Sequence, residues 1–247
     1  MSTTQLSLGI HLRDSSVFAS FYPGRNQPVV DTLLALRAQT PPRVVWLHGT
    51  HAVGKTHLLQ SICARATQRG ERAAFIPMGA FRASGPEMLA GLGALSWVCI
   101  DDVDLILGEA HWERRLFALH QELEEQGGRL VFASMQAPQA LDIQLPDLAS
   151  RLRGGLVLRL QVLDDAEQTA ALKLRAELRG LELNDEVAQY LLRRLPRDMT
   201  ALCEFLDKLD RAALVAQRRL TIPFVKQVMG ESAGYSDDSG SGRDTRK

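Results

Sequence analysis

The sequence predicts an α/β fold, in which a parallel sheet covered by helices is followed by a small all-helical lid domain. Between residues 41 and 163, short apolar runs alternate with helical patterns. A glycine-rich loop, GTHAVGKT, joins one of these runs to the helical pattern that follows. After Leu163 the apolar spacing is wholly helical. Strands that alternate with helices form right-handed crossover units and hence a parallel sheet with both faces covered.

Composition indicates a globular protein without a general affinity for nucleic acid. The chain has 247 residues, of which 45% are hydrophobic, enough for one domain or two small ones. Lys and Arg number 29 and so do Asp and Glu. A protein that grips DNA through its phosphates carries a basic surface, so strong direct DNA binding is not expected.

Cysteine usage and the N-terminal residues predict a cytoplasmic protein. Cys63, Cys99 and Cys203 are far apart and lie in apolar runs, which is typical of reduced, buried thiols and gives no disulfide or metal framework. The first residues, MSTTQLSLGIHL, lack the pattern of a leader peptide. No stretch approaches the roughly 20 apolar residues that a membrane helix needs.

The elements of the sheet domain follow in order along residues 13–163. A turn at YPGRN precedes a helical pattern, VVDTLLALRAQ, and PPR then marks a boundary. Strands are expected at RVVWLH, AAFIPM, SWVCIDD, RLVFAS and GLVLRLQ (155–161). Helical patterns between them are KTHLLQSICARATQ, PEMLAGL and HWERRLFALHQELEEQ.

The lid is expected over residues 164–230, between a core of 13–163 and a polar tail of 231–247 that is expected to be disordered. Its first helix begins with acidic residues and ends before Gly180, and its second, NDEVAQYLLRRL, begins with an Asn cap. The third helix carries an apolar stripe. The stripe consists of Met199, Leu202, Phe205, Leu206, Leu209 and Ala213.

The stretch Gly49–Thr56 matches the phosphate-binding loop: Gly, four residues, then Gly-Lys-Thr, between a strand and a helix. Gly49 and Gly54 let the backbone curl so that N–H groups face the phosphates, and the helix N-terminus adds its dipole. Lys55 would reach the outer phosphates, and the Thr56 hydroxyl would hold magnesium. The residues expected to line the nucleotide are Gly49, Thr50, His51, Ala52, Val53, Gly54, Lys55, Thr56 and His57. The alternative, a glycine-rich turn with a chance lysine, does not explain the flanking strand and helix.

Two further strands end in polar residues. WVCIDD ends in Asp101, which can bind the magnesium, and Asp102, which can polarise the attacking water. RLVFAS ends in Ser134, which can orient that water, although serine at a strand end is a weak signal by itself.

Arg151, in DLASRLRGG, follows a short segment that could project it from the core. An arginine offered to the nucleotide of a neighbouring molecule stabilises the charge on the transferring phosphoryl group. Most surface arginines have no such role, so this assignment depends on the motifs that precede it.

Taken in order, GTHAVGKT, WVCIDD, LVFAS, LASRL and the helical lid resemble the AAA+ ATPases, and within them the group around the replication initiator DnaA. More narrowly the chain is similar to the Hda family of DnaA-related regulatory inactivators. The similarity runs from about residue 5 to residue 228. It includes QLSLGI, FASFYPG, LPDLASRL, LRAELRGLEL, LDRA and LTIPFVK.

The resemblance implies that the N-terminal peptide, residues 1–12, docks on the sliding clamp of DNA polymerase. A clamp-binding peptide needs a glutamine at the pocket rim and spaced apolar side chains. The implied contacts are Gln5, Leu6, Ser7, Leu8 and Ile10. Without the resemblance, this period-two pattern would be read as an edge strand.

The resemblance also implies the function. On a DNA-loaded clamp such a protein stimulates hydrolysis of the ATP bound to DnaA, which inactivates the initiator and inhibits a second round of replication. Arg151 matches the arginine finger of the family. The loop would hold ADP or ATP with Mg²⁺, ADP being the usual nucleotide in this family, and the nucleotide would set the shape and assembly state of the chain.

Two departures from the family pattern bear on nucleotide chemistry. Thr200 stands where the DnaA group usually has a nucleotide-sensing arginine, with Arg197 three residues earlier. Asp102 stands where the wider ATPase class usually has Glu, which predicts weak intrinsic hydrolysis. The phosphate loop is intact, whereas some Hda proteins have a degenerate one, so hydrolysis by the chain itself stays open.

Two other functions compete with this interpretation. An autonomous AAA+ ATPase, either a DnaA-like initiator or a helicase loader, is disfavoured because only a polar tail follows LTIPFVKQVMG, without a helix-turn-helix. A nucleotide-binding scaffold without a catalytic role is the other. The sequence leaves the resident nucleotide, the choice between monomer and homo-oligomer, and the role of the tail undetermined.

Overall fold

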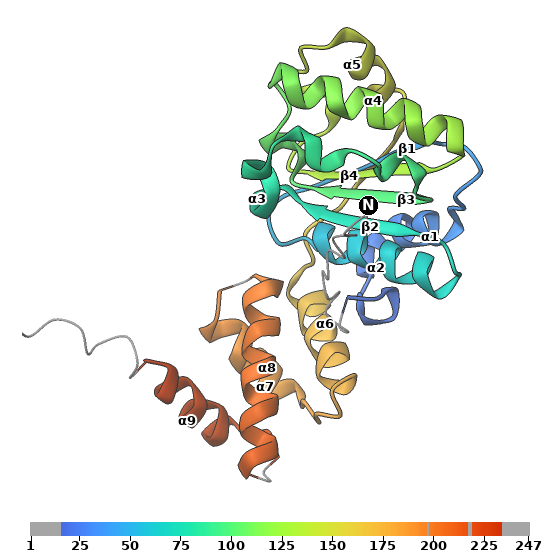
Figure 1. Cartoon of the computed structure of the whole chain (residues 1–247). Helices are drawn as coiled ribbons and strands as arrows, with labels where there is room; N and C mark the ends of the chain where they lie inside the picture. Colours follow the sequence, from blue (N-terminus) through green and yellow to red (C-terminus); the bar gives the residue numbers. More distant parts are fainter. Residues whose placement is uncertain (1–15, 197, 217–218, 234–247) are drawn as a thin grey trace, which may run out of the picture. The chain divides into compact units, whose positions relative to one another are not determined.

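The computed structural model describes residues 16–196, 198–216 and 219–233, with side chains as far as residue 230, and the chain divides after Leu163 into two compact units (Figure 1). The expected clamp-binding peptide, residues 1–12, lies outside the described residues. The last helix ends at Ala233, three residues into the segment expected to be a disordered tail, and the rest of that segment is also outside them.

The first unit contains a five-stranded, fully parallel sheet, which confirms the predicted fold class. The strands are β1 (Val44–His48), β2 (Ala73–Pro77), β3 (Trp97–Asp101), β4 (Arg129–Ser134) and β5 (Leu156–Arg159). Their order in the sheet is β2-β3-β4-β1-β5. Because β1 pairs with β4 and β5 and not with β2, the loop after β1 opens beside the carboxyl end of β4.

Both faces of the sheet are buried, because each strand alternates its apolar side chains between two cores. Val45 and Leu47 pack with α1 (Gln27–Ala35) and α2 (Lys55–Gln68), whereas Trp46 packs on the opposite face. The helices of that opposite face are α4 (Ala110–Gln126) and α5 (Pro146–Arg153). Figure 1 shows the two helix layers on either side of the sheet.

Three segments differ from the sequence-based expectation. PEMLAGL is not one helix: after α3 (Met78–Phe81) come short 3₁₀ turns, separated by Gly85 and Gly91, each with φ of 79°. The first helix ends at Ala35, earlier than its helical pattern. The last strand, expected over 155–161, ends at Arg159. The positive φ of Gly85 and Gly91 interrupts the helical conformation expected at PEMLAGL, and hydrophobic spacing alone does not reveal it.

The turn between α1 and β1 is held by a buried arginine. The guanidinium of Arg129 donates to the carbonyl oxygens of Arg37, Thr40 and Pro42. It lies 5.3 Å from the centroid of the Trp97 ring. Burial, with the charge of Arg43 nearby, lowers the pKa of Arg129 to about 10. This side chain therefore holds the turn that includes PPR, which the sequence pattern marks as a boundary.

The second unit is the predicted helical lid. Its helices are α6 (Asp165–Glu177), α7 (Asp185–Arg194), α8 (Met199–Ala216) and α9 (Ile222–Ala233). Asp164 caps α6 by accepting from the Glu167 backbone N–H at 2.9 Å, and the expected Asn184 cap of α7 accepts from the Val187 N–H at 2.9 Å. Gly180, with φ of 73°, follows α6.

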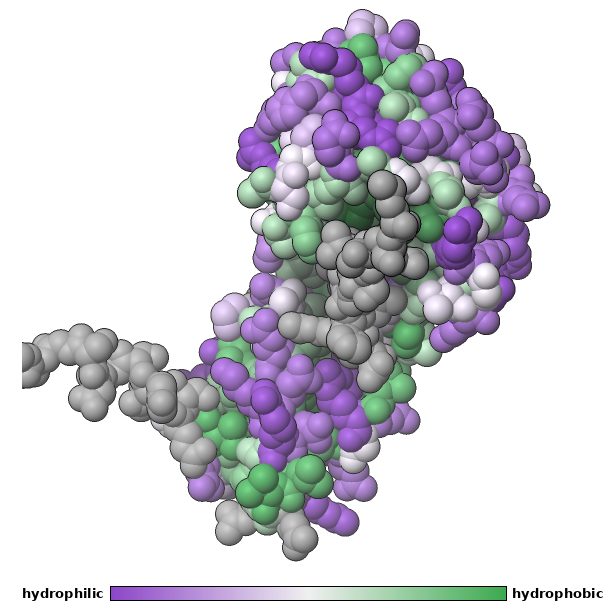
Figure 2. All heavy atoms as spheres, viewed as in Figure 1, coloured by the Kyte–Doolittle hydropathy of each residue, from purple (hydrophilic) through white to green (hydrophobic). Residues whose placement is uncertain are grey.

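A separate apolar core holds the lid together. The expected stripe of α8 is confirmed, since Leu202, Phe205, Leu206, Leu209 and Ala213 are buried and Met199 packs against them. On the face shown in Figure 2, hydrophilic residues cover much of the outer surface of each unit. None of the helices in the described part of the chain is long and apolar enough to cross a membrane.

The cysteines are free thiols in two different settings. Cys63 and Cys99 are buried in the first unit, as expected, whereas Cys203 in α8 is only half-buried. Burial raises the pKa of Cys99 well above its ordinary value. Such thiols behave as small apolar side chains.

Glu113 of α4 is fully buried and joins two loops. Its carboxylate accepts from the backbone N–H groups of Gly108 at 2.8 Å, Gln144 at 3.1 Å and Leu145 at 2.7 Å. It therefore fixes the loop before α4 and the start of α5, the helix that carries Arg151.

We expect Glu113→Ala to lower the free energy of unfolding by about 3 kcal/mol, because three buried N–H groups lose their acceptor. Urea unfolding followed by tryptophan fluorescence measures this, since all three tryptophans lie in the first unit. The control Glu125→Ala, at an exposed position of the same helix, should change it by less than about 0.5 kcal/mol. Equal midpoints for the two variants would contradict this role of Glu113.

Candidate functional site

The loop Gly49–Thr56 leaves the carboxyl end of β1 and enters α2, and its two glycines are required by geometry. A Cβ at Gly49 would lie 2.7 Å from the Leu160 carbonyl oxygen. A Cβ at Gly54 would lie 2.6 Å from the Phe21 ring, and Gly54 also has φ of 95°. Ala52, with φ of 59°, adopts the left-handed region inside the loop. The backbone thus curls as a phosphate-binding loop requires.

Lys55 begins α2 and its side chain lies over the loop. The ammonium Nζ donates to the carbonyl oxygens of Gly49 and Thr50, both at 2.9 Å. Burial lowers the pKa of Lys55, and Asp101 is the largest of the charges that oppose this shift. A cation at a helix N-terminus, beside a curled backbone, is an arrangement that suits phosphate oxygens.

Thr56 and Asp101 form the pair that could hold a metal ion. The Thr56 hydroxyl donates to Asp101 Oδ2 at 2.6 Å. Asp101 is only 2% exposed, and burial, opposed by the Thr56 bond, raises its pKa to about 6. A hydroxyl beside a buried carboxylate fits Mg²⁺, which takes few protein ligands and keeps waters and phosphate oxygens. Among the described residues, no group of three or more His, Cys, Asp or Glu side chains is placed to bind a metal.

Asp102 is half-exposed and adopts an unusual backbone conformation. Its φ is 51°, and its N–H donates to Asp101 Oδ1 at 3.2 Å. Left-handed backbone is costly for a residue other than glycine and is frequent at functional sites. The turn after β3 thus places consecutive carboxylates, one buried and one accessible, at the carboxyl end of the sheet.

Ser134 ends β4 beside His48 of β1. Its buried hydroxyl accepts from the Trp46 indole N–H at 2.9 Å and donates to the Gln136 carbonyl oxygen. The hydrogen of the Ser134 hydroxyl is therefore already donated to an acceptor within the protein. Burial lowers the pKa of His48, helped by the charges of Arg159 and Lys55.

The two histidines of the motif differ in their surroundings. His51 is exposed on the loop. His57 Nε2 lies 2.9 Å from the Val17 carbonyl oxygen, and its ring lies 5.4 Å from that of Phe21. His57 thus joins α2 to the N-terminal segment. The remaining loop residue, Val53, is partly buried against the core.

The segment before α1 completes the surroundings of the loop, although none of the site motifs in the sequence includes this segment. The Asn26 amide donates to the Gln161 carbonyl oxygen at 2.9 Å and accepts from the Gln161 N–H at 2.8 Å. This two-point contact ties the YPGRN turn to the chain that follows β5. Asn26 ends the 3₁₀ turn Gly24–Asn26 and directly precedes α1, and its place as a polar residue in a turn signal is its sequence mark.

Arg151 lies on α5, in the helix layer opposite to α2, and is 42% exposed. Its guanidinium pairs with Glu124 Oε2 of α4 at 3.0 Å. Below this pair lies buried His120, whose Nδ1 has no hydrogen-bond partner among the described residues and lies 3.9 Å from the same carboxylate oxygen. Burial lowers the pKa of His120. No motif in the sequence points to Glu124.

Thr200, the lid position where the DnaA group usually has a nucleotide-sensing arginine, is accessible to solvent. Thr200 is exposed in the first turn of α8, where its N–H donates to Asp198 Oδ1 at 2.7 Å. Arg197 and the clamp-peptide residues lie outside the described residues. The described part of the chain begins at Ser16.

Fold and site together have the arrangement of an AAA+ domain with a phosphate-binding loop. The structure is similar to domain III of the replication initiation protein DnaA from Thermotoga maritima, with a TM-score of 0.71, 22% identity, and coverage of 88% of this chain and 97% of that chain. It is also similar to AMPPCP-bound DnaA from Aquifex aeolicus, with a TM-score of 0.68, 20% identity, and coverage of 91% and 71%. RuvB, a branch migration motor of Thermotoga maritima, matches with a TM-score of 0.63 and 19% identity over 87% and 73%.

The lid gives a more specific comparison than the fold does. Residues 165–229 match the family model described as the lid domain of Hda. The similarity to Hda, a DnaA-related AAA+ protein, that the sequence indicates is thus confirmed: the lid segment matches that family, and 88% of the chain matches the fold of DnaA domain III.

The raised pKa of Asp101 gives a prediction on stability without nucleotide or metal. A carboxyl whose pKa rises from 3.8 to about 6 on folding contributes stability that is complete below about pH 4 and is lost as the pH rises through 6. A shift of about two units sets an upper bound of about 3 kcal/mol. We expect Asp101→Asn to lack this loss, so the variant should unfold at higher urea than the unchanged chain at pH 7.5.

Urea unfolding in EDTA between pH 4.5 and 7.5 measures this effect. Asp142→Asn, at an exposed position, is the control and should keep the pH dependence of the unchanged chain. The same pH slope in Asp101→Asn and in the unchanged chain would contradict the burial of an ionisable carboxyl at this site.

Proposed function

We propose that this chain regulates chromosome replication by stimulating hydrolysis of the ATP bound to DnaA, together with a sliding clamp loaded on DNA. This inactivates the initiator and makes the chain a negative regulator of replication initiation. The observation that carries the proposal is the exposed Arg151 on α5 of a DnaA-like core whose lid matches Hda.

The nucleotide bound by the chain itself is proposed to be ADP or ATP. Lys55 would exchange the two loop carbonyl oxygens for outer phosphate oxygens, and Thr56 with Asp101 would hold Mg²⁺. Magnesium would neutralise phosphate charge when bound. The similarity to AMPPCP-bound DnaA supports nucleotide binding. Asp102 is the candidate for polarising water and Ser134 for orienting it, in which case the Ser134 hydroxyl would release the Gln136 carbonyl oxygen. A slow intrinsic hydrolysis is consistent with the short Asp102 side chain.

Arg151 is proposed to act on the nucleotide of the partner. Its ion pair with Glu124 joins two side chains that are 42% and 48% exposed, and such pairs contribute at most about 1 kcal/mol. The guanidinium can therefore leave Glu124 at little cost and donate to the γ-phosphate oxygens of ATP on DnaA. Water attacks the γ-phosphorus, the bond to the bridging oxygen breaks, and ADP and phosphate leave while Arg151 stabilises the charge.

The clamp contact is proposed from the resemblance alone. Gln5, Leu6, Ser7, Leu8 and Ile10 are outside the described residues, and the pattern QLSLGI carries the assignment. The partners in this proposal are DnaA and the clamp on DNA, with no strong binding to bare DNA. A homo-oligomer is compatible with the proposal but is not needed for it.

A second candidate is an autonomous ATPase that acts as an initiator or helicase loader. The intact loop and the paired Asp101 and Asp102 favour it, because these groups are sufficient to bind a nucleotide and to polarise water. The two functions differ in which molecule's ATP is hydrolysed.

We expect Arg151→Ala to lower the stimulated conversion of DnaA-bound ATP to ADP by about 10³-fold or to background, because an arginine finger contributes 10³ to 10⁵ in rate. The control Arg153→Ala, at an exposed position two residues further on α5, should keep the stimulation. The measurement is the ADP fraction on labelled DnaA after incubation with clamp-loaded DNA.

The same measurement tests the clamp contact with a Gln5→Ala and Leu8→Ala double variant, which should also lose the stimulation. If Arg151→Ala stimulates as well as the unchanged chain, the finger assignment is wrong. If the unchanged chain leaves DnaA untouched and hydrolyses ATP by itself, the autonomous ATPase replaces the proposal.

Binding of the chain's own nucleotide is tested separately. Lys55→Ala should weaken the binding of fluorescent ADP in the presence of Mg²⁺ by about 100-fold or more, because the loop then lacks its cation. Arg151→Ala should bind the same nucleotide as tightly as the unchanged chain does. Undiminished binding by Lys55→Ala would mean that the loop does not hold the phosphates.

A further inference from the structure

Arg151 shares the carboxylate of Glu124 with a second side chain, His120. His120 and Glu124 lie on α4, four residues apart, whereas Arg151 comes from α5. The Arg151 guanidinium lies 3.0 Å from Glu124 Oε2, and His120 Nδ1 lies 3.9 Å from the same oxygen. One carboxylate oxygen therefore faces two groups that can carry a positive charge.

His120 is a polar side chain that is buried without a partner for one of its ring nitrogens. The residue is 5% exposed, and its buried Nδ1 has no hydrogen-bond partner among the described residues. Buried polar atoms are nearly always paired, because an unpaired one loses its hydration without compensation. At 3.9 Å the Glu124 oxygen is too distant for a hydrogen bond, but it is one helical turn away and within reach of a small side-chain rotation.

Glu124 needs a cation because of its place in α4. It lies in the last turn of that helix, where the free backbone carbonyl groups already concentrate negative charge, and this turn contains no basic residue. The nearby carboxylate of Glu122 is held by Arg115 at 2.9 Å. If Arg151 leaves Glu124, His120 can take its place once the ring is protonated, because an imidazolium donates from both of its nitrogens.

Two charges act on the His120 ring in opposite directions. Burial lowers the pKa of His120, the carboxylate of Glu124 opposes this shift, and the guanidinium of Arg151 adds to it. The strand β4 and the 3₁₀ turns Pro86–Leu89 and Leu92–Ala94 also pack against α4, but within the described part of the chain no charge from them acts on this pKa. Protonation of His120 is therefore disfavoured as long as Arg151 holds the carboxylate.

We propose that His120 and Arg151 compete for the Glu124 carboxylate, so that protonation of His120 releases Arg151 toward the nucleotide of the partner. Glu124 is then a positioning residue, which holds the guanidinium against α4 until a phosphate or a proton displaces it. By linkage, a proton on His120 weakens the pair of Arg151 with Glu124 by the same factor by which that pair weakens proton binding. Because exposed ion pairs are weak, this factor is about two- to fivefold.

The proposal rests on the function proposed for Arg151, but the competition for Glu124 is a property of this chain alone. The competition is therefore measured first on the chain without DnaA. Its consequence for stimulated hydrolysis is measured separately, so that a failure of either idea is recognised by itself.

The first experiment is a pH titration of the full ¹⁵N-labelled chain between pH 4.5 and 8.5, followed at the ring nitrogens of His120. His120→Gln identifies these signals. In Arg151→Ala the titration midpoint of His120 should move to higher pH, because the carboxylate then faces no competing cation. In Glu124→Gln, which keeps the size of the side chain without its charge, the midpoint should move to lower pH. The control Arg153→Ala, at an exposed position of the same helix, should leave it unchanged.

The second experiment is the conversion of DnaA-bound ATP to ADP with clamp-loaded DNA at pH 6 and pH 8. Relative to the unchanged chain, Glu124→Gln should stimulate about two- to fivefold more at pH 8, because nothing holds Arg151 back. The difference should shrink at pH 6, where the proton already displaces Arg151 in the unchanged chain. The ratio of the two chains at each pH removes the pH dependence of DnaA itself. Glu125→Gln, at the exposed neighbouring position, should match the unchanged chain at both pH values.

Three results would overturn the proposal. One is a His120 ring that stays neutral over the whole pH range in every chain. Another is a midpoint that Arg151→Ala does not move, or that Arg153→Ala moves as much. The third is stimulation by Glu124→Gln that does not exceed that of the unchanged chain at pH 8. If the midpoints move as expected but the unchanged chain does not stimulate DnaA at all, the function proposed for Arg151 is wrong and the competition for Glu124 stands.

Discussion

The pairing of β1 between β4 and β5 is the constraint on which the functional site depends. Because the sheet is parallel, every strand delivers its carboxyl end to the same edge, and the order β2-β3-β4-β1-β5 brings the ends of β1, β3 and β4 close together. The phosphate-binding loop, Asp101 and Ser134 follow those ends. Residues more than eighty positions apart in the chain, such as His48 and Ser134, thus become neighbours.

Buried polar side chains fix the loops at both edges of the sheet. Glu113 binds three backbone N–H groups, Arg129 binds three carbonyl oxygens, and Asn26 makes a two-point contact with Gln161. Each satisfies backbone groups that no helix or strand serves, so removing one would leave buried donors or acceptors unpaired. The charged residues of the site itself, Lys55 and Asp101, are also buried, and their pKa shifts show that burial opposes their charges.

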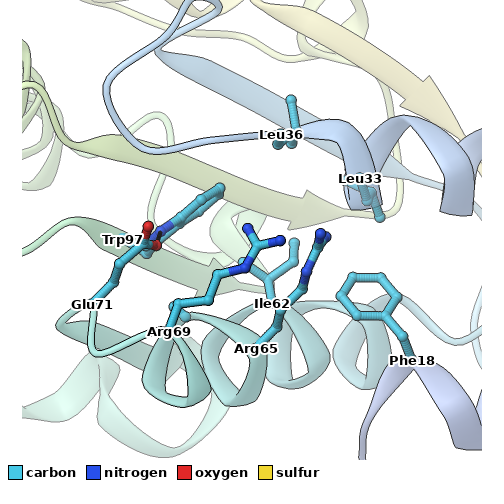
Figure 3. A pocket seen from close by; sticks show the side chains of 9 residues that line it. Phe18, Leu33, Leu36, Ile62, Arg65, Arg69, Glu71 and Trp97 are labelled. Atoms are coloured by element: carbon cyan, nitrogen blue, oxygen red, sulfur yellow. Dashed lines mark hydrogen bonds between the residues drawn. The ribbon is translucent and has the colours of Figure 1, made fainter.

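The two faces of the sheet carry different kinds of exposed arginine. Arg151 lies on the α4 and α5 layer and pairs with Glu124, a surface contact that another anion can replace. Arg65 lies on the α1 and α2 layer beside apolar walls (Figure 3), where the charge of Glu71 nearby offsets part of its own. In the function proposed above, Arg151 meets a phosphate. A chain of zero net charge thus has local positive sites without a general affinity for DNA.

The sequence by itself determined the fold class, the lid and the loop with its flanking elements, because alternating apolar periods, caps and a glycine-lysine-threonine motif are local signals. The N-terminal caps at Asp164 and Asn184 and the buried stripe of α8 are of this kind. The local apolar spacing predicts a helix at PEMLAGL, whereas positive φ at Gly85 and Gly91 allows only short turns there.

Only the tertiary structure decided which distant groups meet. The contact between Thr56 and Asp101, the pair of Arg151 with Glu124 and the bonds of Glu113 to Gln144 and Leu145 join residues that are 27 or more positions apart. The hydrophobic periodicity of an element predicts which of its faces is buried, but not which residues pack against that face. Partners across the fold are selected by packing and by the need to satisfy buried polar groups, and these exist only once the chain is folded.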